Sequence, residues 1–480
     1  MANLTADLGR FLAKIQFDDL PADSLPLVRD AYTDTVGVIM VGIDEPVVEI
    51  ARRTFIEQDS AREARICLSS IYASAPNAAL IGGVAAHAHD YDDQSLSGHP
   101  SAVMVPALLA EGEVLGSSGR DLVTGYVAGY EVWAELLRRS SSYHRKGWHP
   151  TSVFGVIAAA AATAVLHRLP AKRAATALAI AASHAGGLAA NFGTMTKPYH
   201  AGRAARDGLV ATRLAAAGMT AGANTLENPQ GFLTAVSSDM TPDRDSPARA
   251  GMDWYLLRQR LCIKKYPTCY FMHRSFDAVV KILAARKVEP DDIAEIEVTM
   301  GKGQTSVLVN ERPRTGLEAK FSEQFAMAAA AILGHMDVAD LTDAVVQRSD
   351  IQSFFPKIML KAVDEYDARD PAHSPTERVV IRLNSGELLD SGPIVKIRGH
   401  AYDPLSRDEL WEKFRSCTAR THAEKDANQL FELLQSIDVL RSARDLPSCE
   451  MIFGKARQQK TIPLASAIGA RCNAAGPASA

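Results

Sequence analysis

The sequence predicts a mainly α-helical protein, in which an all-helical bundle domain is built from both chain ends and an α+β domain is inserted between them. Up to residue 264 the chain is rich in alanine and places apolar residues at helical spacing. Alternation with period two appears after residue 290, and helical spacing returns at Ser406. At 480 residues the chain is also longer than one typical core requires. We therefore expect a helical domain over residues 1–264, an α+β domain over 265–405, a helical return over 406–470 that packs on the first domain, and a disordered tail over 471–480.

The helical part contains two kinds of predicted helix. Residues 8–15, 24–40 and 47–57 carry apolar side chains at helical spacing, which predicts helices with one buried face. Residues 152–167 and 173–183 are apolar almost all round. A helix without a polar face is buried on every side, so we expect these two segments to be central helices of the bundle.

The α+β part shows strand and hairpin patterns. Residues 295–300 alternate polar and apolar side chains, which predicts a half-buried strand. Residues 378–383 are followed by an Asn-Ser-Gly turn and a second apolar run, which is typical of a β-hairpin. Between them, residues 322–333 predict a buried, alanine-rich helix. After this part, residues 407–414 and 426–434 predict helices with mixed charged and apolar faces.

Composition argues against several classes of protein. The net charge is −4 and basic residues do not form long runs, so we expect no binding to nucleic acid or to a membrane surface. The longest uncharged window, residues 177–196, contains His184 and Asn191 and is too polar for a membrane span. The six cysteines lack disulfide or zinc spacing, and the N-terminus does not resemble a signal peptide. We expect a reduced, cytoplasmic protein without a metal or organic cofactor.

Four segments place ionisable residues inside apolar surroundings, and they are the candidates for chemistry. They are residues 87–101, 147–152, 191–203 and 262–273. The first packs three histidines and three aspartates into thirteen residues. A metal site at His87-x-His89-Asp90 is an alternative for it, although residues two apart do not share one face of a helix. That alternative implies a metal-dependent hydrolase.

Two of these segments share one design. His99-Pro100-Ser101 and His149-Pro150-Thr151 each place a histidine just before a proline that can begin a helix. A helix N-terminus favours a bound carboxylate, so these two imidazoles and Lys197 can form an anion pocket that also transfers protons. Of Lys264 and Lys265, we expect only one to point inward.

The motifs as they stand are HAHDYDD, GHPS, GWHPTS, GTMTKPYHAGRAARDG, LENPQGF and KKYPTCYFMH. With these motifs in this order, the chain from residue 5 to residue 460 resembles the MmgE/PrpD family. That family includes 2-methylcitrate dehydratases, cis-aconitate decarboxylases and an iminodisuccinate epimerase. The resemblance implies a helical bundle with an α+β lid, a homodimer, and a small polycarboxylate substrate.

The resemblance also implies the residues of the site. The catalytic set falls on Asp90, His99, His149, Lys197 and Lys264, and substrate binding is assigned to Lys197, Lys264, Gln94 and His200. Two positions depart from the family. Gln94 stands where decarboxylating relatives have Thr, and His89 stands where an aliphatic residue is more common.

We therefore expect a carbon–oxygen lyase that dehydrates a citrate-like acid such as 2-methylcitrate. Lys197 and Lys264 would hold carboxylates, His99 and His149 would act as acid and base, and Asp90 would orient one of them. Epimerisation of iminodisuccinate and decarboxylation of cis-aconitate are alternatives within the family. Outside it, the alternative is a non-catalytic binding protein.

Overall fold

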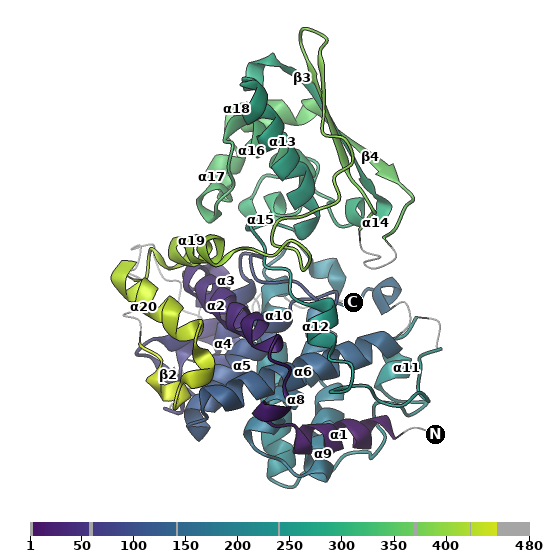
Figure 1. Ribbon diagram of the computed structural model, residues 1–480, viewed down its shortest axis with the longest axis vertical. Helices are drawn as coiled ribbons and strands as arrows, with labels where there is room; N and C mark the ends of the chain where they lie inside the picture. Colours follow the sequence, from purple (N-terminus) through teal and green to yellow (C-terminus); the bar gives the residue numbers. More distant parts are fainter. Residues whose placement is uncertain are drawn as a thin grey trace, which may run out of the picture.

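The computed structural model describes residues 3–56, 61–140, 143–238, 241–367, 373–422 and 424–448. Within these ranges the protein is mainly helical, with a small sheet in a separate α+β domain, which confirms the predicted fold class (Figure 1). The predicted tail over 471–480 and the end of the helical return beyond residue 448 lie outside the described residues. None of the helices in the described ranges has the length and apolarity needed to cross a bilayer.

Most helices of the helical domain come from the first part of the chain. Its helices are α1 (Leu4–Lys14), α2 (Ser24–Gly42), α3 (Pro46–Phe55), α4 (Ala75–His87), α5 (Pro100–Leu115), α6 (Gly119–Arg139), α7 (Pro150–Val153), α8 (Gly155–Leu166), α9 (Ala171–Ala182), α10 (Thr196–Ala216), α11 (Phe232–Val236) and α12 (Tyr255–Gln259). A two-stranded ribbon, β1 (Ala64–Arg65) and β2 (Tyr72–Ala73), precedes α4.

The two all-apolar segments differ in how they are buried. The first forms α7 and α8, which meet at Phe154, and nearly all of α8 is buried as predicted. The second forms α9, where the prediction of burial on every side is wrong: Arg173 is exposed and Thr176 is only partly buried. Alanine is tolerated on a solvent face as easily as in a core, so alanine content alone did not distinguish an inner helix from an outer one.

The last two helices return to the first domain. They are α19 (Arg407–Thr418) and α20 (Glu424–Leu434), and they lie beside α2 (Figure 1). The close approach is possible because Gly37 of α2 has no side chain: a Cβ there would lie 3.0 Å from the Phe414 ring. Phe414 and Phe431 are buried in the same core as the N-terminal helices. The helical domain is therefore made from both ends of the described chain.

The α+β domain has its own hydrophobic core. Its sheet has the strand order β4-β3-β5-β6, with bounds β3 (Ile293–Gly301), β4 (Ile358–Val363), β5 (Arg378–Leu383) and β6 (Leu388–Asp390). Strands β3 and β4 are parallel, whereas β5 and β6 are antiparallel and confirm the predicted hairpin. The helices are α13 (His273–Arg286), α14 (Lys302–Thr305), α15 (Gly316–Ala319), α16 (Glu323–Ile332), α17 (Asp343–Val346) and α18 (Ser349–Phe354).

Glycines allow a close helix crossing in the helical domain, between α4 and α10. Gly83 and Gly202 face each other, and a Cβ on Gly83 would lie 2.7 Å from the Cα of Gly202. A Cβ on Gly202 would lie 2.3 Å from the backbone oxygen of Leu80. Backbone cannot yield as a flexible side chain can, so α10 approaches α4 only because both positions are glycine.

We predict that Gly202→Ala destabilises the helical domain by roughly 1–3 kcal/mol, the usual range for overpacking. The added methyl must push α10 away from α4, and thermal or urea unfolding will detect the loss. Gly186→Ala is the matched control, because a Cβ there meets only the flexible Arg203 side chain, at 3.4 Å. Equal stability of the two variants would contradict the tight crossing.

Candidate active site

The centre of the site is the turn of residues 88–93 that follows α4, here called the 88–93 turn. Asp90 has a left-handed backbone conformation, with φ of 53°. Three buried lysines donate to carbonyl oxygens of this turn: Lys320 to Ala88 (3.1 Å), Lys264 to Asp90 (2.6 Å) and Lys413 to Tyr91 (2.8 Å). The C-terminal end of a helix carries partial negative charge, so ammonium groups are favourable there. They hold the turn in an otherwise costly conformation.

The carboxylate of Asp90 lies between two ammonium groups. Its Oδ1 is 2.5 Å from Lys197 Nζ and 3.1 Å from Lys264 Nζ. Burial alone would raise the pKa of Asp90, but Lys197 and then Lys264 lower it well below its ordinary value. Lys197 also lies against two aromatic rings, with Nζ 5.5 Å from the centroid of Phe192 and 5.1 Å from that of Phe321. Since Phe321 comes from the α+β domain, both domains enclose this lysine.

A second buried carboxylate binds two histidines. His87 Nδ1 lies 2.9 Å from one oxygen of Asp92, and His99 Nδ1 lies 3.0 Å from the other. Burial would raise the pKa of Asp92, but the two imidazoles lower it well below its ordinary value. The rings of His87 and His99 lie close together, with centroids 4.3 Å apart. Asp92 therefore fixes the orientation of both rings.

His149 reaches the same cluster from α7. It is the residue before Pro150 at the start of that helix, and its backbone N–H donates to the Gly187 oxygen at 3.0 Å. Its ring centroid is 6.0 Å from that of His87, and its Nδ1 is 3.0 Å from Nδ1 of His200 on α10. Burial lowers the pKa of His149 well below its ordinary value, and neighbouring positive groups, Lys197 among them, lower it further.

The arrangement suits proton transfer next to fixed positive charge. Burial also lowers the pKa of His87 to about 3 and that of His200 to about 4. His87, His149 and His200 are therefore neutral at physiological pH and able to accept a proton. The ammonium groups of Lys197 and Lys264 are positioned to stabilise negative charge that develops on a bound carboxylate.

The structure brings the five predicted catalytic residues together. Asp90, His99, His149, Lys197 and Lys264 are all buried and lie around the 88–93 turn. His99 and His149 directly precede the first residues of α5 and α7, as predicted from their His-Pro context. Lys264 points inward, whereas the side chain of Lys265 is 39% exposed and pairs with Asp277.

The two remaining predicted residues lie at the edge of the cluster. The backbone of Gln94 pairs with that of Cys262, and its side chain is partly buried. His200 contacts His149 directly. The substrate-binding roles assigned to Gln94 and His200 stay predictions.

Sequence reasoning missed three members of the cluster and considered a fourth, His87, only as a metal ligand. His87 and Asp92 lie in the same polar segment as Asp90, so the crowding of histidines and aspartates was a usable signal. Lys320 and Lys413 gave no local signal, because each lies far along the chain from the turn that it contacts. The unusual His89 is also explained in part: its Nδ1 accepts from Lys320 at 3.2 Å and its Nε2 lies 3.2 Å from the Val41 oxygen.

Four residues of the cluster are arranged so that they could together bind a metal ion. These residues are His87, Asp90, Asp92 and His99, and their ligand atoms all lie within 4.8 Å of one another. A divalent ion bound to Asp90 would lie beside the ammonium groups of Lys197 and Lys264, which already contact the same oxygen. Repulsion between cations at this separation opposes metal binding, so the geometry favours protons and an anionic ligand.

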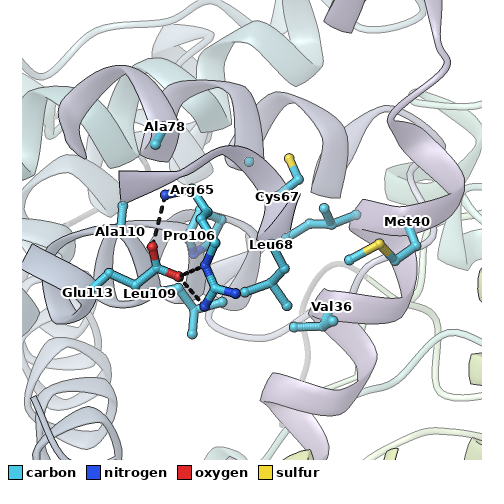
Figure 2. Close-up of a pocket in the computed structure, with 12 residues that line it drawn as sticks. Val36, Met40, Arg65, Cys67, Leu68, Ala78, Pro106, Leu109, Ala110 and Glu113 are labelled. Atoms are coloured by element: carbon cyan, nitrogen blue, oxygen red, sulfur yellow. Dashed lines mark hydrogen bonds and ion pairs between the residues drawn. The ribbon is translucent and has the colours of Figure 1, made fainter. Parts of the chain in front are cut away.

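A small cavity in the helical domain is a separate feature (Figure 2). It is lined mainly by apolar side chains, among them Met40, Cys67 and Leu109. The guanidinium of Arg65 beside it is already paired with Glu113, at 2.6 Å, as the dashed lines in Figure 2 indicate. The charges of Arg65 and Glu113 at this cavity are therefore balanced by each other.

We predict that acid destabilises the folded protein through its neutral histidines. The folded pKa values of His87 and His200 are about 3 and about 4, whereas an unfolded histidine titrates near pH 6.5. Between these values the unfolded chain binds more protons, so the free energy of unfolding falls as the pH drops below about 6.5. Thermal unfolding across this window should show a shallower pH dependence in His200→Asn, but not in the exposed control His335→Asn. An unchanged slope in His200→Asn would contradict this explanation.

Comparison with known proteins identifies the family. The MmgE/PrpD N-terminal domain matches residues 6–245, and the MmgE/PrpD C-terminal domain matches residues 266–438. The chain is 28% identical to cis-aconitate decarboxylase of Homo sapiens over 390 residues, which cover 78% of each protein. It is 24% identical to a cis-aconitate decarboxylase-like protein of Aspergillus oryzae over 92% of this chain and 96% of that protein. It is 23% identical to cis-aconitate decarboxylase of Aspergillus terreus over 92% of this chain and 94% of that protein. The two domain matches together cover most of the sequence, and the chain belongs to the MmgE/PrpD family.

Proposed function

We propose that the protein is a lyase that dehydrates a small citrate-like polycarboxylate by acid–base chemistry. The observation that supports this most is the pairing of Asp90 with two buried lysines beside a set of neutral imidazoles. Asp90 supplies one negative charge to these two ammonium groups, so a substrate carboxylate can bind to the same pair. Among the described residues, the buried Nε2 of His87 has no hydrogen-bond partner, so a polar atom of a substrate has a place to bind.

In the proposed reaction, one imidazole acts as a base and takes a proton from the carbon next to a carboxylate. A second imidazole acts as an acid and protonates the hydroxyl on the neighbouring carbon. The C–H electrons form the double bond as the C–O bond breaks, and water leaves. His149 and His99 are assigned to these two proton transfers. Lys197 and Lys264 stabilise the negative charge that builds up on the carboxylate as the C–H bond weakens. Asp90 holds both lysines in place.

Decarboxylation is the second candidate, because the relatives compared above are named cis-aconitate decarboxylases. The same cationic groups would stabilise the carbanion left when carbon dioxide departs, and one imidazole would protonate it. We rank this reaction second because Gln94 replaces the Thr that the resemblance leads us to expect in decarboxylating relatives.

One NMR experiment distinguishes these reactions. The purified protein is incubated with 2-methylcitrate, citrate, cis-aconitate, iminodisuccinate and a matching mono-acid, and the products are read from the proton spectrum. We expect loss of water from a citrate-like acid, with no turnover of the mono-acid. A decarboxylated product of cis-aconitate, or epimerisation of iminodisuccinate, would show that the protein catalyses another reaction of the family instead. Absence of turnover of every polycarboxylate would contradict an enzymatic role for this site.

Variants assign the activity to this site. His149→Ala should lower turnover by ~10² or more, the usual scale for losing a positioned acid or base. Lys264→Gln should lower it far more than Lys265→Gln, since Lys264 contacts Asp90 whereas Lys265 pairs with Asp277. Equal activity of the two lysine variants would rule out the assigned role of Lys264.

A further inference from the structure

We propose that His200 is a positioning residue that holds His149 in one tautomer, with the proton on Nδ1 and Nε2 free to accept a proton from the substrate. The inference rests on the proposed role of His149, and it goes beyond that role because it assigns a function to the neighbour behind it. In this role His200 acts through His149, which would replace the substrate-binding role predicted for it from the sequence.

The contact itself restricts the tautomers. Nδ1 of His149 and Nδ1 of His200 are 3.0 Å apart, and both side chains are buried. A neutral imidazole has one nitrogen with a hydrogen and one with a lone pair. Two neutral rings can share a hydrogen bond through their Nδ1 atoms only if one donates and the other accepts. The two histidines must therefore have opposite tautomers.

Both rings are kept neutral by their surroundings. Burial lowers the pKa of each, and Lys197 lowers both further. His87 and His99 also act on His149, and Arg203 acts on His200. Protonation of either ring would place a third positive charge next to Lys197 and Arg203. A neutral pair joined by one hydrogen bond is thus the favoured resting state.

The chemistry selects one of the two arrangements. If His149 donates from Nδ1, it can gain a proton at Nε2 and keep the bond to His200 unchanged. If His149 instead accepts at Nδ1, its only free lone pair is already used, and taking a proton would break the bond. A group that accepts a proton in the reaction therefore needs the first arrangement, in which His200 accepts at Nδ1 and has its own hydrogen on Nε2.

Hydrogen bonds of the neighbouring backbone hold His149 in position relative to His200. Arg203 donates to the backbone oxygens of His184 and Gly186, at 3.2 and 2.7 Å. The next residue, Gly187, accepts the backbone N–H of His149. It has φ of 136°, and a Cβ there would lie 2.8 Å from Ser152. This loop therefore fixes His149 against α10, where His200 is located.

Three substitutions test the proposal through the pH profile of turnover. His200→Ala removes the acceptor and should lower kcat by about 10- to 100-fold, the scale seen when a metal-bound histidine loses its orienting partner, with little change in KM. His200→Asn retains an acceptor at the same position and should restore most of kcat. His200→Asp adds a negative charge, which raises the pKa of His149. Because the base must be deprotonated, the acid limb of the profile should move to higher pH.

The matched control is His184→Asn, on the same loop, whose side chain is 37% exposed. It should leave kcat and the pH profile as in the wild type. A His200→Ala variant with unchanged kcat, or a His200→Asp variant with an unmoved acid limb, would overturn the proposal.

A second readout does not need a substrate, so it separates failure of this proposal from failure of the proposed function. Nitrogen NMR of the protein labelled on its histidine rings distinguishes the two tautomers, and the His149 signal is assigned by its loss in His149→Gln. We expect hydrogen on Nδ1 of His149 in the wild type and in His200→Asn, and a mixture in His200→Ala. Hydrogen on Nε2 in the wild type, or an unchanged tautomer in His200→Ala, would refute the positioning role even if no substrate is turned over.

Discussion

The burial of two ionised carboxylates in one short turn is the constraint on which the rest of the structure depends. Asp90 and Asp92 are at most 4% exposed, and such groups are stable only if they are paired. The partners come from distant parts of the chain: Lys197 from α10, Lys264 from the junction of the domains, and two histidines from the helices beside the turn. The turn is therefore stable only in contact with these segments.

A lysine of the returning helices also supports this turn. Lys413 of α19 donates both to the Tyr91 oxygen and to the Lys264 oxygen, each at 2.8 Å, and pairs with Asp34 at 2.6 Å. Burial raises the pKa of Asp34 to about 6, and Lys413 opposes that rise. Lys320 makes the equivalent contact from the α+β domain. The groups that stabilise the fold thus also set the charge and the proton affinity of the site, so stability and chemistry are closely linked here.

Local patterns in the sequence predicted much of this. Helical spacing, the alternation that became β3 and the turn between β5 and β6 depend on neighbouring residues, as do the positions of His99 and His149 before a proline. Contacts across long stretches of chain were beyond such reasoning. Lys320 and Lys413 resemble ordinary surface lysines in sequence, and the pairing of His149 with His200 depends on how α7 and α10 meet. The resemblance to a family located the residues of the site but not the hydrogen bonds among them.

The most direct test of the central claim is amide hydrogen exchange of the 88–93 turn in Lys413→Met. Lys413 is not among the residues assigned to substrate, so the variant tests the support of the turn and not the chemistry. If lysines from distant segments hold the turn, its amides should exchange at least about tenfold faster, a loss of roughly 1.4 kcal/mol of local stability. Amides of β3 should be unaffected, and the exposed control Lys425→Met should match the wild type. Unchanged exchange at residues 90–93 in Lys413→Met would contradict the claim that lysines from distant segments hold the turn.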